Sequence, residues 1–408
     1  MKCRFCQSEV TRSFVDLGHQ PPSNAYLTEE QLGQPEITYP LRAFVCEECW
    51  LVQLPAHAHA DELFTEDYAY FSSVSSTWVD HARKYVEAMI QRLQLGSDSM
   101  VVEIASNDGY LLQFVQQAGI PCVGIEPTAS TATASREKGI ETIEEFFGDD
   151  FARRFIEARP RVDLLIGNNV LAHVPNLNDF VAGVSVVLNT DGVVTFEFPH
   201  VMRLVEGLQF DTIYHEHYSY FSFSTVYRIF EHHGLRVFDV QELITHGGSL
   251  RVFATPTIGT LHQPTDAVSN LLQREHQAGM LDMAWYDGFQ SRVDCVKNDL
   301  LRFLLEKRRA NELIVGYGAA AKGNTLLNYA GVRQDLLPFV CDAAPSKQGR
   351  YLPASHIPIR IPDALRTHEP SVVMILPWNI ADEIIDQHNY VTDWGGQFAS
   401  AVPELRIL

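Results

Sequence analysis

The sequence predicts an α/β protein in which a small cysteine-containing domain precedes a doubly wound, Rossmann-like domain and a second, smaller Rossmann-like α/β domain. Three observations indicate this fold class. Two Cys-x-x-Cys pairs lie within the first 49 residues, apolar strands alternate with helical segments from about residue 76, and another strand-turn-helix start begins at residue 312. At 408 residues the chain is long enough for two to four domains.

Composition and charge narrow the class of protein. Hydrophobic residues make up 46% and charged residues 20% of the chain, which is typical of a globular protein and excludes collagen, coiled coil and wholesale disorder. The formal net charge of -20 repels phosphates, so it disfavours nucleic acid and anionic membranes as partners. No signal-peptide core opens the chain, and no apolar stretch is long enough to span a membrane, so we expect a cytoplasmic protein.

Four cysteines indicate a structural zinc site. Cys3 with Cys6 and Cys46 with Cys49 supply four thiolates from two tight turns, the ligand set of a tetrahedral zinc site. The 39 residues between the pairs are more than a compact zinc ribbon uses. We therefore interpret residues 7–45 as a long segment that extends from the two Cys-x-x-Cys turns. The alternatives are two unrelated turns or a redox pair. The three other cysteines are expected to be buried thiols: Cys122, Cys295 and Cys341.

The alternation of elements predicts where the domains lie. Apolar strands are expected at residues 100–104, 122–125, 162–167 and 192–198, with helical segments at 78–95 and 180–188. Apolar runs separated by helices indicate a parallel sheet covered on both faces. We predict four parts: a zinc-binding N-terminal domain (1–75), a central domain (76–265), a helical connector (266–308) and a C-terminal α/β domain (309–408).

The turn after the first central strand predicts an adenosine cofactor. A strand ending in the small-residue turn 105–109 exposes backbone N–H groups before a helix, and Glu126, 23 residues after Glu103, can accept hydrogen bonds from both ribose hydroxyls. The turn lacks the glycine pattern of a dinucleotide binder, and an acidic residue on the first strand favours S-adenosylmethionine. An ordinary turn with a surface Asp is the alternative. The predicted cofactor contacts are Glu103, Ala105, Asn107, Asp108, Gly109, Glu126 and Asn168.

A dense polar and aromatic cluster indicates the reacting centre. Residues 210–222 read FDTIYHEHYSYFS, and so many titratable and aromatic side chains are costly to bury unless each polar group finds a partner. His173 follows the strand at 162–167 and is expected at the carboxyl edge of the sheet, where doubly wound folds bind ligands. Taken alone, His173 is more typical of a structural histidine, but the second cluster shifts the balance toward a functional one.

The chain resembles a known family over nearly its whole length. The matching segments, as they stand here, are the two Cys pairs, YAYFSS (68–73), EIASNDGYLL (103–112), NNVLAHVPN (168–176), FDTIYHEHYSYFS (210–222), GGSLRV (247–252) and GYGAAAKGNTLLNY (316–329). Together they are similar to the nucleotide-sugar C-methyltransferases that make branched deoxysugars. The resemblance implies a zinc-binding domain, an S-adenosylmethionine domain and a C-terminal domain that helps to hold the nucleotide-sugar.

The resemblance also implies the chemistry and the residues that perform it. Family members usually methylate a ring carbon next to a keto group, typically C3 of a dTDP-4-keto-deoxysugar. Carried over by position, His217 becomes the candidate general base, and the residues expected around the sugar are Tyr214, Glu216, His173 and Tyr68. Ala105 departs from the glycine that is common in methyltransferase turns, which implies a slightly reshaped methionine pocket.

The residue types are chemically consistent with that role. A C–H next to a ketone is a weak acid, so its removal needs both a base and a donor to the developing enolate oxygen. His217 is suited to take the proton, and His173 or Tyr214 to donate, while Glu216 orients a neighbour or binds a sugar hydroxyl. His215, two positions away, is expected to contact the substrate and is the competing candidate for the base.

The C-terminal α/β domain is predicted to hold the diphosphate of the substrate. Lys322 and Asn324 lie in the turn before a helix, and a helix N-terminus beside an ammonium group suits an anion. Lys347 and Arg350 follow the strand at 337–341 and add local positive charge. The alternative is a degenerate Rossmann-like domain with solvated lysines.

Two other functions remain open on the sequence. One is methylation of another small acceptor, at oxygen or at an acidic carbon, on the same scaffold. The other is a non-catalytic, zinc-containing binding protein. The net charge disfavours nucleic acid as a ligand of such a protein, and the His and Tyr cluster disfavours a purely binding role.

Overall fold

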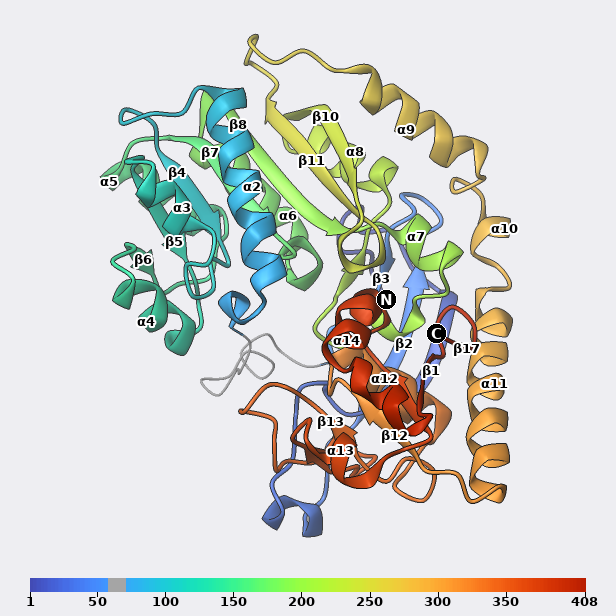
Figure 1. Ribbon diagram of the computed structural model, residues 1–408. Coiled ribbons are helices and arrows are strands. Elements are labelled where there is room, and N and C mark those ends of the chain that lie inside the picture. Colours follow the sequence, from blue (N-terminus) through green and yellow to red (C-terminus); the bar gives the residue numbers. More distant parts are fainter. Residues whose placement is uncertain (58–70) are drawn as a thin grey trace.

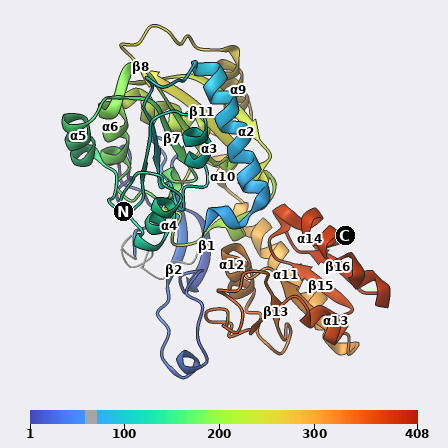
Figure 2. The same cartoon turned by 60° about the vertical axis from the view of Figure 1, so that its left-hand side comes forward.

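The computed structural model describes residues 1–57 and 71–408, which form three sheets (Figure 1). The central α/β part lies above the C-terminal α/β part in Figure 2, and the N-terminal strands (blue) extend below the central part, to the left of the C-terminal part. In these described ranges we find no helix that combines the length and the apolar character needed to cross a membrane. The predicted fold class is confirmed, whereas the domain limits stay predictions.

The N-terminal sheet takes one strand from far along the chain. Its order is β1-β2-β3-β9, all antiparallel, with bounds Arg12–Gln20, Tyr39–Val45, Val52–Gln53 and Ser219–Tyr220. Val52 pairs with Tyr220 and Gln53 with Ser219. The polar cluster of residues 210–222 is therefore tied by backbone hydrogen bonds to the domain that carries the cysteines.

The central sheet has the order β10-β11-β8-β7-β4-β5-β6. The strands are β4 (Val101–Ile104), β5 (Cys122–Ile125), β6 (Thr142–Ile143), β7 (Val162–Asn168), β8 (Leu188–Pro199), β10 (Leu235–Leu243) and β11 (Ser249–Pro256). The five from β4 to β8 are parallel, as predicted, because helices connect them. The strands β10 and β11 are antiparallel, since only a short turn joins them, and we did not predict them from the sequence.

Helices cover both faces of the central sheet, which makes it doubly wound. They are α2 (Ser76–Leu93), α3 (Leu112–Gln117), α4 (Ala129–Glu137), α5 (Asp149–Ala158), α6 (Leu177–Val187) and α8 (Phe223–His232). The short α7 (Val201–Glu206) packs instead into the core shared by the N-terminal strands and the C-terminal domain. The α2 helix begins where the Ser75 hydroxyl accepts from the Trp78 N–H, and ends where Gln94 takes a left-handed conformation. Its buried side chains join one core, and those of α5, α6 and α8 join another.

A helical connector leads to the C-terminal sheet. It contains α9 (Asp266–Gln277), α10 (Met283–Tyr286) and the long α11 (Phe289–Arg309), which runs down one side of the molecule (Figure 1). The sheet that follows has the order β14-β13-β12-β15-β16-β17. Its strands are β12 (Ile314–Tyr317), β13 (Val340–Cys341), β14 (Ile359–Arg360), β15 (Val372–Ile375), β16 (Gln397–Ser400) and β17 (Arg406–Ile407), and its helices α12 (Ala321–Ala330), α13 (Ala364–His368) and α14 (Ala381–Gln387).

One expectation about the cysteines is wrong. Cys341 is buried and Cys122 is half-buried, but Cys295 is exposed on α11. The helix buries one stripe of apolar side chains against the strands, and Cys295 lies off that stripe.

A buried glutamate joins the connector to the central domain. Glu275 on α9 has no exposed surface and accepts four hydrogen bonds, from His200 Nε2 (2.6 Å), the N–H groups of Phe223 (2.6 Å) and Ser224 (2.7 Å), and the Ser224 hydroxyl (2.6 Å). Burial raises the pKa of Glu275, but the bonds from His200 and Ser224 outweigh it and leave this pKa below its ordinary value.

We predict that Glu275→Gln lowers the free energy of unfolding by about 3 kcal/mol, because the amide turns an N–H group toward backbone donors in a buried site. Urea titration at pH 7 measures this loss. The contribution of Glu275 should be fully present above its unfolded pKa of about 4.3 and be lost as the pH falls below it, since the folded pKa is the lower one. Glu242→Gln, which breaks exposed ion pairs with Arg203 and Arg274, is the control and should cost less than about 1 kcal/mol.

Candidate active site

The four predicted zinc ligands lie on two turns of the same shape. In one turn the Gln7 N–H donates to the Cys3 carbonyl (3.2 Å), and in the other the Trp50 N–H donates to the Cys46 carbonyl (2.9 Å). Gln7 and Trp50 both adopt left-handed backbone angles, with φ of 63° and 64°. In each turn the backbone therefore folds back over its Cys pair, so that both thiols of the pair face the same point.

The sulfur geometry fits zinc. The Sγ atoms of Cys3, Cys6, Cys46 and Cys49 all lie within 4.8 Å of one another. A tetrahedral zinc ion with Zn–S distances of about 2.3 Å would separate its sulfurs by about 3.8 Å. The Cys49 thiol donates to Cys3 and lowers the pKa of Cys3 to about 4, whereas burial raises the pKa of Cys46 to about 11. Zinc supplies the positive charge that a set of four thiolates needs in this buried position.

The cysteine turns are docked on the central domain. Asn178 Nδ2 on α6 donates to the carbonyl of Phe5 (2.9 Å), and Thr225 Oγ1 on α8 donates to the carbonyl of Cys49 (3.0 Å). Both helices pack on the sheet that carries His173. The metal site thus stabilises the framework of the active site from outside it.

We predict that Cys49→Ser abolishes stoichiometric zinc and lowers the thermal midpoint by more than about 5 °C, because three thiolates hold the metal less tightly and the turn no longer supports α8. Atomic emission and calorimetry measure the two effects. Cys295→Ser removes an exposed thiol and is the matched control, with zinc content and midpoint unchanged. Full zinc retention in Cys49→Ser would contradict the assignment of the ligands.

The turn after β4 is shaped for close approach of a ligand to the backbone. Ala105, Asn107 and Gly109 have positive φ angles of 55°, 49° and 74°. The carboxylate of Glu126, at the end of β5, accepts from the N–H of Asn107 (2.9 Å) and from the N–H of Thr128 (2.8 Å). These bonds hold the turn and leave further lone pairs of Glu126 for ribose hydroxyls. The contact with ribose stays a prediction.

Polar groups without partners point to a cofactor at this edge of the sheet. Among the residues that the structure describes, buried Ser106 Oγ and Asn168 Oδ1 have no hydrogen-bond partner. Burial also raises the pKa of Glu103 well above its ordinary value, although the Tyr110 hydroxyl partly offsets it. A buried polar group of this kind is costly unless a ligand satisfies it. These oxygen atoms suit the ribose hydroxyls and the ammonium group of S-adenosylmethionine, which supplies an electrophilic methyl group when bound.

Lys138, which sequence reasoning missed, holds the cofactor turn in place. Its Nζ donates to the backbone carbonyl of Asp108 (2.7 Å) and to Asp108 Oδ2 (3.1 Å). The Ser73 hydroxyl donates to the same carboxylate. Asp108 is 2% exposed, so its charge is directed toward the protein rather than toward solvent. The predicted contact of Asp108 with the cofactor stays a prediction.

We predict that Lys138→Met weakens S-adenosylmethionine binding about tenfold, because the Asp108 carboxylate loses its ion pair and the turn loses a backbone anchor. Isothermal calorimetry measures the dissociation constant. Lys84→Met, which removes an exposed ion pair with Asp80, serves as the control and should leave binding unchanged. Equal affinities for the two variants would show that Lys138 does not order the turn.

The structure brings His173 and His217 together. Their ring centroids lie 4.6 Å apart, although 44 positions separate them in the chain, and the Tyr214 ring lies 4.1 Å from His217. His217 Nδ1 lies 3.1 Å from the Thr212 carbonyl oxygen. A carbonyl oxygen only accepts, so Nδ1 carries the proton and Nε2 has the free lone pair of a base.

Burial keeps the histidines neutral. It lowers the pKa of His173 to about 4, against a hydrogen bond with the Glu216 backbone, and it holds the pKa of His217 well below its ordinary value, with His173 acting in the same direction. At neutral pH the His217 ring is therefore unprotonated and able to accept a proton.

The two neighbours of His217 in the motif face the N-terminal domain. Glu216 Oε1 accepts from Asn24 Nδ2 at 2.7 Å, and the His215 ring packs edge-on against Tyr39 of β2 at 5.8 Å. Burial lowers the pKa of His215 to about 4. His215 thus contacts the N-terminal sheet, whereas His217 contacts His173. Tyr68 lies outside the described residues.

Three of the four C-terminal candidates, Lys322, Asn324 and Lys347, lie around the start of α12. Lys322 Nζ donates to Asn379 Oδ1 (2.5 Å) and lies over the Trp378 ring, beside the 210–217 segment. Asn324 is 1% exposed and donates to the Ser23 carbonyl (2.5 Å). Lys347 Nζ donates to the Ala319 carbonyl (2.9 Å) at the turn before α12, and Arg350 is exposed. Their contacts with substrate stay predictions.

A second polar cluster at the carboxyl edge was not foreseen. Glu197 on β8 is fully buried and accepts from Arg251 (2.7 Å) and from the Thr245 hydroxyl (2.9 Å), and His81 on α2 lies 2.9 Å from it. The next turn places His246 3.1 Å from Asn169. Arg251 in the GGSLRV motif was the one sequence signal for this cluster. No regular spacing connects that motif to the segments that carry Glu197 and His81.

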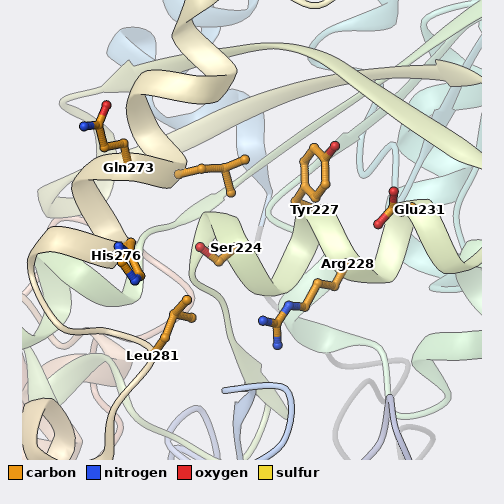
Figure 3. A pocket seen from close by; sticks show the side chains of 8 residues that line it. Ser224, Tyr227, Arg228, Glu231, Gln273, His276 and Leu281 are labelled. Atoms are coloured by element: carbon orange, nitrogen blue, oxygen red, sulfur yellow. The ribbon is translucent and has the colours of Figure 1, made fainter.

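A surface hollow of about 450 Å³ lies elsewhere, between α8 and α9. Figure 3 shows Tyr227 and Arg228 from α8 opposite Gln273 and His276 from α9. The cofactor turn and the paired histidines take no part in it.

Comparison with known proteins identifies the family. Three family models match in succession: a putative zinc binding domain at residues 3–64, a methyltransferase domain at 78–240 and a C-methyltransferase C-terminal domain at 244–403. The chain is 35% identical to C-methyltransferase NovU from Streptomyces niveus, over 100% of this chain and 96% of that protein. The chain belongs to this family of C-methyltransferases. It is an S-adenosylmethionine-dependent C-methyltransferase with a four-cysteine zinc-binding domain, which confirms the predicted resemblance and both cofactors.

Solved structures with distant likeness cover less than half of this C-methyltransferase. A methyltransferase from Thermotoga maritima, described as a possible histamine N-methyltransferase, has 15% identity and a TM-score of 0.36, covering 48% of this chain and 99% of that one. Magnesium protoporphyrin IX methyltransferase from Synechocystis with bound S-adenosylmethionine has 14% identity and a TM-score of 0.34, covering 44% of this chain and 81% of that one.

Proposed function

We propose that this enzyme methylates a ring carbon next to the keto group of a nucleotide-linked sugar, with a dTDP-4-keto-deoxysugar as the substrate class. The observation that carries the proposal is the pairing of His217 with His173 at the carboxyl edge of the central sheet, close to the end of β7 at Asn168. A neutral imidazole with an unprotonated Nε2 supplies the base that enolisation requires, and Tyr214, whose ring lies 4.1 Å from that of His217, is the proposed donor to the oxygen.

In the proposed reaction His217 Nε2 accepts the proton of the carbon next to the ketone, and the electron pair of the C–H bond moves toward the ketone oxygen. Burial disfavours imidazolium, so proton transfer depends on stabilising the charge pair that it creates. Tyr214 is proposed to donate to the enolate oxygen, because the single N–H group of neutral His173 already bonds to the Glu216 backbone. Glu216, oriented by Asn24, is proposed to bind a sugar hydroxyl. The enolate carbon then receives the methyl group of the cofactor.

The nucleotide is proposed to lie against the C-terminal domain. Asp342, which follows β13, accepts from the N–H of Ala319 (2.7 Å) and from the N–H of Ala344 (2.8 Å). Glu126 makes the same pair of contacts in the central domain. It accepts from the N–H of Asn107 in the turn and from the N–H of Thr128, two residues further along the chain. The repeated arrangement supports a second nucleoside-type site, and Lys347 beside this turn suits a diphosphate.

We predict that His217→Ala lowers kcat by about 10² to 10⁴ with S-adenosylmethionine affinity unchanged, because the proton acceptor is lost. His215→Ala, the matched control at the histidine that contacts Tyr39, should keep kcat within about tenfold. The assay follows methyl transfer to a dTDP-4-keto-6-deoxysugar by mass spectrometry, and solvent deuterium entering the carbon next to the ketone in the absence of methyl donor.

Three outcomes would contradict the proposal. Loss of turnover only in His215→Ala would show that the base had been assigned to the wrong histidine. Methylation without any deuterium exchange in the wild type would favour oxygen as the acceptor atom. Methyl transfer to no keto sugar would exclude the proposed substrate class.

A further inference from the structure

Trp378, in the C-terminal domain, contacts three separate segments around the paired histidines. It begins a short 3₁₀ turn, Trp378–Ile380, just after β15. Its Nε1 donates to Asp211 Oδ2 at 2.7 Å, and Lys322 Nζ lies 4.4 Å from the ring centroid. The ring edge also lies against Gly247, where an added Cβ would be only 2.4 Å from Trp378 Cη2.

Asp211 is a carboxylate that depends on these neighbours. It has no exposed surface, and its Oδ1 lacks a hydrogen-bond partner among the described residues. Burial raises the pKa of Asp211 to about 6, while the Lys322 charge and the Trp378 hydrogen bond act in the opposite direction. A buried carboxylate with one side-chain donor is sensitive to the loss of that donor.

Asp211 is joined through the backbone to the candidate base. It lies within the turn Phe210–Thr212, and the carbonyl of Thr212 accepts the His217 Nδ1–H. On the next residue, the Ile213 carbonyl accepts from Thr325 Oγ1 of α12 at 3.0 Å. Any displacement of Asp211 therefore moves the acceptor that orients the His217 ring.

We propose that Trp378 is a positioning residue for His217, by which the C-terminal domain holds the 210–217 segment in its productive conformation through Asp211. This inference rests on the proposed role of His217 as the base. Trp378 lies in none of the segments that carry the family resemblance. Asp211 lies in the 210–222 segment, but no role was predicted for it from the sequence.

The same contacts predict how the loss of the indole donor depends on pH. The charged and titratable groups that face this region are Lys322 from α12, His246 from the turn after β10, His173 and His217 itself. Without the Trp378 donor, the pKa of Asp211 rises further above its ordinary value. Asp211 is then protonated at a pH where the wild-type side chain is still ionised, so the loss of activity should grow as the pH falls from 8 toward 6.

Trp378→Phe removes the N–H donor and keeps an aromatic ring beside Lys322, but it also removes the outer indole atoms that lie against Gly247. The double-mutant cycle with Asp211→Asn therefore assigns the effect to the hydrogen bond. Trp394→Phe is the matched control: it removes an Nε1 hydrogen bond to the Pro370 carbonyl (3.0 Å) in the same domain, away from Asp211. We expect Trp378→Phe to lower kcat about 10- to 100-fold at pH 7, with KM and S-adenosylmethionine affinity within about twofold, and Trp394→Phe to keep wild-type kcat.

A double-mutant cycle tests whether the effect passes through Asp211. Asp211→Asn should lower kcat to a similar extent, and Trp378→Phe combined with Asp211→Asn should be no worse than the more damaging single variant. Thermal midpoints of all variants are measured in parallel. Additive losses in the cycle would overturn the proposed route.

A readout without substrate separates this inference from the proposed function. Nitrogen-15 spectra of histidine-labelled enzyme, assigned with His217→Ala, should show His217 as the Nδ1–H tautomer in the wild type and in Trp394→Phe. The Trp378→Phe variant should lose that preference. An unchanged tautomer and an unchanged kcat in Trp378→Phe would overturn the positioning role. If no keto sugar is methylated by the wild type, the proposed function fails, and the tautomer result still decides whether Trp378 positions His217.

Discussion

One hydrogen bond, from His217 Nδ1 to the Thr212 carbonyl, determines which nitrogen of the candidate base is free. The bond joins residues five positions apart, so it forms only while the 210–217 segment keeps its curvature. Three parts of the chain hold that curvature: β3 of the N-terminal sheet pairs with β9, Asn24 binds Glu216, and the C-terminal domain supplies Trp378 and Thr325. A short segment without regular structure can be rigid when neighbouring domains over-determine it.

Burial of the histidines also keeps a lone pair available on the candidate base. An imidazole surrounded by protein is kept neutral, which preserves its lone pair, but it becomes a weaker base. Charged groups near the site have partners: Asp211 with Trp378, Glu197 with Arg251, and Lys322 with Asn379. The negative charge of an enolate would then be stabilised by groups that are already oriented, without rearrangement of solvent.

The two α/β parts hold their turns by the same means. In each, an acidic side chain after the second strand accepts from a backbone N–H of the turn that follows the first strand. The acidic group thereby shapes the turn even before any ligand arrives. The zinc knuckles act at a greater distance, because they support α6 and α8, and through these helices the sheet edge that carries His173.

The sequence by itself determined the elements that depend on local pattern. Apolar runs specified β4, β5, β7 and β8. The spacing of four cysteines specified the metal ligands Cys3, Cys6, Cys46 and Cys49. Both patterns can be recognised because each strand and each Cys-x-x-Cys turn is formed by residues close together in the chain. The antiparallel edge strands β10 and β11 were missed, and Cys295 was misjudged, because exposure depends on which face of α11 finds a partner. The tertiary structure alone decided that His217 rather than His215 meets His173, and that Lys138, Asp211 and Trp378 support the site. Those contacts join residues separated by tens to more than a hundred positions, so no local pattern encodes them and only the packing of the domains brings them together.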